Sequence, residues 1–298
     1  MRIQGAVASA AVLVAALAAG CGGSVDEAAP PVTPASTPTT QASAPSSPAD
    51  PSRVPATSPS PEPGTVPPEW LGTRILPRTE SGYGEVRATP PELVNRRFTL
   101  PDQVPMLPGD GFASRITSPP PDEVIARSTW QPGCPVGVDD LAWIRLTFHG
   151  FDGERHTGEL LVNARVADDI VAVFADLWDA EFPIEQMVIA RQTELDAPPT
   201  GDGNGTGAFN CRPTTGSSSF SQHAYGLAID VNAFQNPYQK GDVVLPELAA
   251  SYLDRANVRP GMILAGDPVV RAFARIGWEW GGAWRTLEDY QHFSENGR

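Results

Sequence analysis

The chain carries the sequence SQHAYGLAID at residues 221–230, and this stretch predicts both a local fold and a local chemistry. Residues 226–232 are expected to form a strand, because large apolar side chains alternate there with small or polar ones. His223 and Asp230 can converge only if the chain turns between them, and Gly226 can adopt the backbone angles of such a turn. Alone, this spacing suits a structural turn as well as half of a metal site.

The C-terminal sequence GWEWGGAWRTLEDYQHFS, residues 277–294, adds Asp289 and His292. A catalytic zinc ion typically takes three protein ligands and keeps a fourth position for water, with an unbound carboxylate as base. His223, Asp230 and His292 are therefore predicted as metal ligands, and Asp289 remains as the base. The tryptophans of this stretch are expected to line a cleft or to belong to the core, with at least one of them buried.

Together, the spacing SxHxxGxAxD at 221–230, DxxH at 289–292 and the Trp-Gly-Gly stretch resemble the D-alanyl-D-alanine carboxypeptidase family of zinc peptidases. Vancomycin-resistance carboxypeptidases and phage L-alanyl-D-glutamate endolysins are relatives of this family. The similarity extends to FNCR at 209–212 and NPY at 236–238, and it covers about residues 112–298.

This resemblance implies a small single α+β domain whose central, mainly antiparallel sheet carries one zinc ion. Asp289 is then the general base and later the general acid. Arg212 is the candidate to bind the developing oxyanion or a substrate carboxylate, although Arg191 also lies upstream. Ser221 is expected to shape the site or to touch substrate. The alternatives are an Arg212 paired with an acidic loop residue and a Ser221 that only forms a turn.

Two positions depart from the family pattern. His292 is followed by Phe293 and Ser294 where relatives often have an acidic residue, and Ala283 stands where an aspartate is common. Neither change removes a predicted ligand. Both put substrate preference or the support of the metal ligands in question, because neighbouring groups orient those ligands.

Apolar periodicity agrees with an α+β fold built on a mainly antiparallel sheet. His149 and His156 flank the turn of a predicted hairpin and are expected to be solvated loop residues. The predicted strands are 141–148, 158–164 and 187–191, and the predicted helices are 168–180, 246–255 and 268–276, the last with Asp267 as N-cap.

The N-terminal region predicts export. Residues 1–21 hold one arginine, a short apolar run and a final Cys21, which resembles a lipoprotein signal with Cys21 as the lipidated residue; a plain signal peptide is the alternative. Residues 22–68 are rich in Pro, Ser, Thr and Ala and predict a disordered linker. Residues 69–111 are then an N-terminal extension, and residues 112–298 are the peptidase domain.

The net charge limits the class of binding partner, and the cysteine content indicates the redox conditions of the compartment. The formal net charge of −14 argues against a nucleic-acid partner. Besides Cys21, the chain has Cys134 and Cys211, which in an exported protein predict a disulfide; two free thiols are the alternative.

From these observations we expect an exported, monomeric protein that is lipid-anchored on the outer face of the cytoplasmic membrane. Its expected substrates are peptidoglycan stem peptides. A D,D-carboxypeptidase is the first expectation, and an endopeptidase cutting within the stem, such as at L-alanyl-D-glutamate, is the second. A non-catalytic wall-binding lipoprotein with the same fold is the rival from another class.

Overall fold

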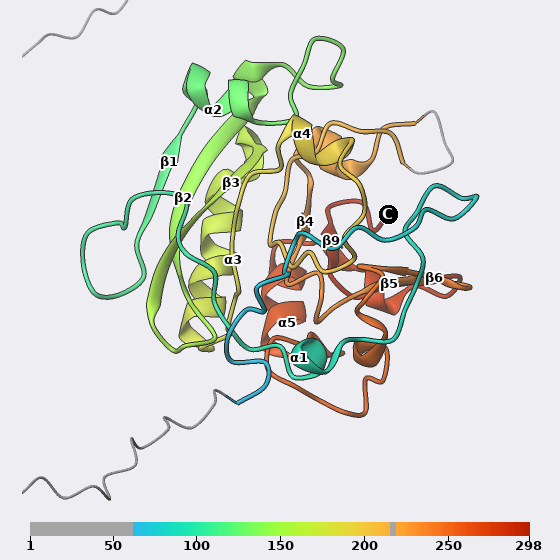
Figure 1. The fold of residues 1–298 in the computed structure, drawn as a ribbon. Helices are drawn as coiled ribbons and strands as arrows, with labels where there is room; N and C mark the ends of the chain where they lie inside the picture. The colour runs from blue at the N-terminus through green and yellow to red at the C-terminus, as the bar shows by residue number, and fades with distance from the viewer. Residues whose placement is uncertain (1–61, 215–218) are drawn as a thin grey trace, which may run out of the picture. The chain divides into compact units, whose positions relative to one another are not determined.

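The computed structural model describes residues 62–214 and 219–298 (Figure 1). They belong to one compact unit, Ser58–Arg298. The predicted signal peptide, Cys21 and most of the predicted linker lie outside the described residues. Residues 62–68, predicted as linker, are tied to the fold, because the N–H of Arg97 donates to the carbonyl of Gly64 at 2.8 Å.

The first sheet is antiparallel with the strand order β1-β2-β3. Its hairpin is the one predicted from the sequence. The first strand is one residue longer than predicted, and the second begins three residues earlier and ends one residue earlier. The helix predicted at 168–180 is also confirmed, as α3, and it packs against β2 (Figure 1). The elements are β1 Ser114–Thr117, β2 Leu141–His149, β3 Arg155–Asn163 and α3 Ala167–Asp179.

Alternation along β2 explains how this sheet is covered on both faces. Ala142, Ile144 and Leu146 are buried in the main core, which also contains the apolar stripe of α3. Leu141 lies in a smaller cluster with Val124 of helix α2, Asp122–Arg127. The sheet therefore forms the rigid wall on which the rest of the domain is built.

Two further antiparallel sheets stand where a single central sheet was expected, and their strands are short. One has the order β4-β9-β7 and the other the order β6-β5-β8. Residues 226–232, predicted as one strand, contribute only three residues to the first of them. The strands are β4 Ala228–Asp230, β5 Tyr238–Lys240, β6 Val243–Leu245, β7 Glu279–Trp280, β8 Glu288–Asp289 and β9 His292–Ser294.

Among the helices, α5 matches its prediction, and the Asp267 side chain accepts from the N–H of Val270 as the N-cap. The α-helices besides α3 are α1 Pro91–Val94, α2 Asp122–Arg127, α4 Gln192–Leu195 and α5 Pro268–Arg275. The 3-10 turns are η1 Val138–Asp140, η2 Ala164–Val166, η3 Gln222–Tyr225, η4 Ala250–Tyr252 and η5 Gly281–Ala283.

The helix predicted at 246–255 is wrong, because only η4 forms there. The main-chain groups that a helix needs are bonded elsewhere. The N–H of Leu248 donates to Gly201, its carbonyl accepts from the Thr89 hydroxyl at 2.6 Å, and the carbonyl of Glu247 accepts from Arg87. The N-terminal extension and a distant loop thus take the hydrogen bonds that the local periodicity assigned to a helix.

The strand predicted at 187–191 is likewise reduced to an isolated bridge between Met187 and Thr206. Its main chain pairs with two neighbours in turn: the carbonyl of Met187 accepts from Glu159, and the N–H of Val188 donates to Thr206. This segment joins the first sheet to the loop that precedes the SQHAYGLAID stretch.

The predicted extension, residues 69–111, packs into the same unit as the predicted peptidase domain. Leu93 and Phe98 share a core cluster with Phe234 and Tyr252. Arg96 is buried and makes two hydrogen bonds to the Glu185 carboxylate, at 2.7 and 2.6 Å. Burial raises the pKa of Glu185, and the Arg96 charge opposes that rise. A paired, buried arginine thus fixes the extension to the domain.

Cys134 and Cys211 form the predicted disulfide, which links residues 77 positions apart. His149 and His156 are not solvated loop residues. His149 stacks on Trp178 with ring centroids 3.8 Å apart, and His156 Nδ1 lies 2.9 Å from Asp102 Oδ1. Within the described residues, no helix has the length and apolar character needed to cross a membrane.

Candidate metal centre

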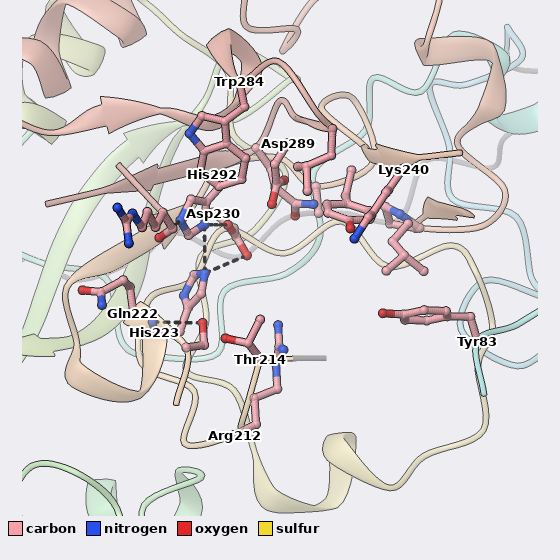
Figure 2. Close-up of a pocket in the computed structure, with 18 of the residues that line it drawn as sticks. Tyr83, Arg212, Thr214, Gln222, His223, Asp230, Lys240, Trp284, Asp289 and His292 are labelled. Atoms are coloured by element: carbon pink, nitrogen blue, oxygen red, sulfur yellow. Dashed lines mark hydrogen bonds and ion pairs between the residues drawn. The ribbon is translucent and has the colours of Figure 1, made fainter. Parts of the chain in front are cut away.

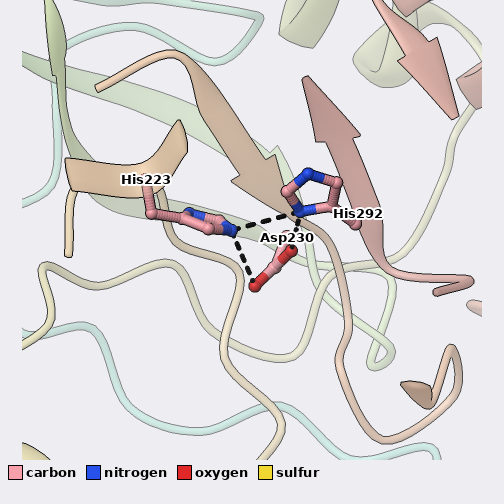
Figure 3. A group of neighbouring side chains, drawn as sticks. All are labelled: His223, Asp230 and His292. Carbon is pink, nitrogen blue, oxygen red and sulfur yellow. Dashed lines mark hydrogen bonds and ion pairs between the residues drawn. The ribbon is translucent and has the colours of Figure 1, made fainter. Parts of the chain in front are cut away.

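Three structural elements bring His223, Asp230 and His292 together (Figure 3). His223 lies in η3, Asp230 ends β4, and His292 begins β9. Asp230 and His292 are directly opposite each other in the antiparallel β4–β9 pair. The strand pairing therefore places two of the groups side by side, and the turn has to deliver the third.

Gly226 makes that turn possible. It follows η3 in the left-handed conformation, with φ of 66°. A Cβ at this position would lie 2.4 Å from the main-chain nitrogen of Asn163, so the turn also packs against β3 too closely for a side chain. The predicted turn is thus confirmed. Glycine is needed there both for the left-handed backbone conformation and for the close approach to β3.

Distances within the group fit a single metal ion. The facing atoms are 3.2 Å apart for His223 Nε2 and His292 Nδ1, 3.3 Å for His223 Nε2 and Asp230 Oδ2, and 3.1 Å for His292 Nδ1 and Asp230 Oδ1. Two atoms bound to one zinc ion at about 2.05 Å in tetrahedral geometry lie about 3.3 Å apart. The side chains are therefore already spaced as ligands of a common ion.

The outer nitrogen of each imidazole is held by a main-chain carbonyl. His223 Nδ1 lies 2.6 Å from the carbonyl oxygen of Ala208, and His292 Nε2 lies 3.3 Å from that of Arg298. A carbonyl can only accept, so each outer nitrogen carries the proton in the neutral ring. The two inner nitrogens then present lone pairs to each other, an arrangement that a cation stabilises.

The carboxylate of Asp230 has an electrostatic environment suited to a ligand. Burial acts to raise its pKa, but the positive charge and hydrogen bonds that His223 and His292 supply when protonated hold the pKa of Asp230 well below its ordinary value. The group is thus kept in the anionic form that binds metal.

Asp289 lies in β8, three residues before His292, and is not one of the three converging groups. Burial raises the pKa of Asp289 to about 7, and the negative charge of Asp230 adds to the rise. Its Oδ1 is buried and has no hydrogen-bond partner in the described part of the chain. A carboxylate of this pKa with one free oxygen can exchange protons near neutrality.

A cavity of about 1200 Å³ opens over these groups (Figure 2). His223, Asp230, Asp289 and His292 line it, together with Tyr83 of the extension and Trp284 of the C-terminal stretch. Trp284 stands beside His292, with ring centroids 5.5 Å apart. Trp278, by contrast, is buried in the main core, as expected for at least one tryptophan of this stretch.

Arg212 also lines the cavity, and its positive charge lowers the pKa of Asp289, although more weakly than other groups do. Its guanidinium donates to the carbonyl of Pro213 over 3.4 Å, and no acidic side chain among residues 62–214 and 219–298 forms an ion pair with it. Arg191 donates to Gln103 Oε1 at 2.6 Å and does not line the cavity. Of the two arginines, Arg212 is the one placed to meet a bound anion.

Ser221 caps the turn that carries His223. Its hydroxyl accepts from the N–H of His223 at 3.4 Å, and its carbonyl accepts from Ala224. The residue also lines the cavity. Ser221 therefore forms the turn and stands within reach of a ligand at the same time.

The two departures from the family pattern lie at different depths. Phe293 is fully buried and stacks on Phe273, with ring centroids 4.0 Å apart, so it serves the core. Ala283 is exposed at the cavity lining, where its small side chain leaves space.

Tyr83, Glu247 and Lys240 line the cavity but did not stand out in the sequence. Tyr83 reaches the cavity through a loop whose next residue, Gly84, donates its N–H to Glu247 Oε1 at 2.7 Å. No motif marks these positions, because they come together only through packing of the extension.

Residues 215–295 match the family model described as D-alanyl-D-alanine carboxypeptidase. The family predicted from the sequence is thereby confirmed over that stretch, which contains all three converging residues and Asp289. No curated protein and no solved structure gives a significant match. At the level of the family, the match supports a peptidase, and the His223, Asp230 and His292 group can hold a metal ion.

Proposed function

We propose that this chain, whose residues 215–295 match the D-alanyl-D-alanine carboxypeptidase family, is a zinc-dependent peptidase that hydrolyses peptidoglycan stem peptides. A D-alanyl-D-alanine carboxypeptidase is the first specific activity. The observation that carries the proposal is the separation of 3.1 to 3.3 Å between the facing atoms of His223, Asp230 and His292, beside an Asp289 whose Oδ1 has no partner among the described residues. A structural turn needs none of these relationships.

In this proposal, His223, Asp230 and His292 would hold zinc, which when bound would supply an activated water and a Lewis acid for the scissile carbonyl. Asp289 accepts the proton of the attacking water through its unpaired Oδ1 and later returns it to the leaving amine. The guanidinium of Arg212 faces the negative charge that develops on the substrate or a substrate carboxylate. Ser221 holds the turn and contacts the substrate.

The predicted setting agrees with this activity. A lipid anchor at Cys21 and a Pro-rich linker would keep the folded unit outside the cytoplasmic membrane and within reach of the cell wall as a monomer. This part of the proposal rests on sequence, since Cys21 lies outside the described residues.

Mass spectrometry of muropeptides after incubation with the zinc-loaded protein tests the activity. Loss of one terminal alanine supports the carboxypeptidase, and release of a longer peptide supports an endopeptidase instead. Firm binding of muropeptides without zinc and without cleavage would favour the non-catalytic wall-binding protein and contradict the proposed enzyme. Asp289→Asn is the matched control, since it should retain the metal and lose the product.

A further inference from the structure

A second cavity, of about 270 Å³, reaches the metal centre along the segment that precedes the SQHAYGLAID stretch. His223, Asp230 and Arg212 line this cavity and also the larger one. The two cavities therefore meet at the converging side chains, and a bound chain can extend from that point into both.

The charged residues differ between the two cavities. Apart from the groups that they share, the second cavity has one charged lining residue, Glu194, whose carboxylate accepts from the N–H of Arg191. The larger cavity adds the cationic residues Lys240, Arg285 and Arg298 and the acidic residues Glu247 and Asp289. Cationic residues outnumber acidic ones in this added set, whereas Glu194 repels a terminal carboxylate, so the larger cavity suits the C-terminal side of a peptide.

One wall of the second cavity comes from the sequence GDGNGTG at residues 201–207. Asp202, Asn204 and Thr206 are buried and hydrogen-bonded into the protein: Asp202 accepts from Gly72, Asn204 donates to Glu185, and Thr206 accepts from Asn232. The alternate residues Gly203, Gly205 and Gly207 line the cavity. Thr206 lines the cavity as well, so this wall is mostly main chain and carries no side chain at Gly203, Gly205 and Gly207.

Packing within the chain does not require glycine at two of these positions. A Cβ on Gly203 or Gly205 would meet no atom within 4 Å, and neither residue has a positive φ. Glycine costs about 0.5–1 kcal/mol relative to alanine in an extended segment. The bare wall leaves room for a group that is not part of this chain.

Unpaired polar groups at the same wall point to a ligand. The N–H and carbonyl of Gly203 have no hydrogen-bond partner among residues 62–214 and 219–298. Asn210, which also lines the second cavity, has a buried side-chain oxygen with no partner in the described chain. A buried polar group is normally paired, so the Asn210 oxygen is available to an amide of a bound peptide. The main-chain groups of Gly203 are exposed and can be reached by the same peptide.

We infer that the second cavity binds the main chain of an extended peptide on the N-terminal side of the scissile bond, with Gly205 providing the clearance. The inference rests on the proposed function for the identity of the peptide. Recognition then requires residues before the cleaved bond, so an isolated terminal dipeptide cannot occupy the second cavity.

Calorimetric binding to the zinc-loaded Asp289→Asn protein tests this without turnover. The ligands are an N-acetylated stem pentapeptide ending in D-alanyl-D-alanine and the dipeptide D-alanyl-D-alanine. Gly205→Ala should raise the Kd of the pentapeptide about 3-fold and Gly205→Val about 10-fold or more, with the dipeptide unaffected. Thermal midpoints should stay equal or rise, because each side chain enters open space and restricts the unfolded chain.

Gly111→Ala and Gly111→Val are matched controls. Gly111 is exposed, has no atom within 4 Å of an added Cβ and lines neither cavity, so both ligands should bind as before. An unchanged pentapeptide Kd in a folded Gly205→Val protein would overturn the inference. Binding of the pentapeptide without cleavage by the wild type would refute the proposed enzyme and leave the subsite supported, whereas absence of pentapeptide binding would overturn the subsite as well.

Discussion

Asp230 and His292 face each other across the β4–β9 pair, with Oδ1 of the aspartate 3.1 Å from Nδ1 of the histidine. Residues 62 positions apart in sequence are thus fixed as neighbours by strand register alone. A shift of one residue would turn His292 to the opposite face of the sheet. The register of this short sheet is therefore what assembles the candidate metal centre.

His223→Ala should abolish stoichiometric zinc binding, because two ligands do not make a closed protein site. Asp289→Asn should keep zinc and lose turnover by about 10²–10⁴-fold, as expected for removal of a general base. Metal analysis of dialysed protein and muropeptide assays separate the two effects. His149→Phe, which preserves the stacking on Trp178, is the control. Full turnover in the Asp289 variant would contradict its role.

Metal-free protein should lose stability as the pH rises from about 4 to 7, through Asp289. Its folded pKa of about 7 exceeds the ordinary value of 3.8, so the folded state binds more protons in this range. At pH 8, metal-free Asp289→Asn should therefore be more stable than wild type by about 2–4 kcal/mol, and the gain should vanish near pH 4.

Urea unfolding of chelator-treated wild type and Asp289→Asn at both pH values measures this difference directly. Titrating groups distant from Asp289 behave alike in the two proteins, so their effects cancel in the comparison. A gain of the same size at pH 4 and pH 8 would show that ionisation of Asp289 is not its cause.

Gly281→Ala should displace the segment that carries Asp289 and His292. A Cβ on Gly281 would lie 2.7 Å from the carbonyl oxygen and 2.9 Å from the Cβ of Asp289, and 3.3 Å from the Cβ of His292. Zinc affinity should fall about 10-fold or more, as for other disturbances of groups that support a ligand. Gly137→Ala is the control, because the nearest atom to its added Cβ is 3.4 Å away and it lines neither cavity. Equal zinc affinity in both variants would show that the close approach at Gly281 does not control the position of the metal ligands.

Arg96→Met should cost about 3–5 kcal/mol of unfolding free energy, because it leaves Glu185 buried without its charged partner. Arg165→Met is the matched control. It removes an exposed ion pair with Glu295 and should change stability by less than about 1 kcal/mol. Chemical denaturation of both variants gives the comparison, and similar losses would mean that burial of the Arg96 pair does not decide its contribution.

The Cys134–Cys211 disulfide should stabilise the fold and hold the loop of Arg212. On the chain-entropy account, closing a loop with a sequence separation of 77 stabilises by about 4 kcal/mol. Replacing both cysteines by serine should lower the thermal midpoint and, because Arg212 follows Cys211 directly, raise KM more than it lowers kcat. An unchanged KM in the folded variant would show that Arg212 is positioned independently of the disulfide.

The sequence by itself determined the parts of this protein that depend on neighbouring residues. The hairpin of β2 and β3, the helices α3 and α5 and the turn at Gly226 follow from local periodicity, capping and backbone freedom. The three converging residues and the family were also predicted, because two short motifs, at residues 221–230 and 289–292, carry the residue types and spacing of a metal site.

Tertiary structure decided what depends on contacts between distant segments. The helix predicted at 246–255 gave way to hydrogen bonds with Thr89 and Gly201, and the extension was drawn into the domain through Arg96. The pKa of Asp289 and the two cavities that meet at the candidate metal centre have the same origin. Local sequence cannot specify them, because burial, desolvation and shape arise only when separate segments pack together.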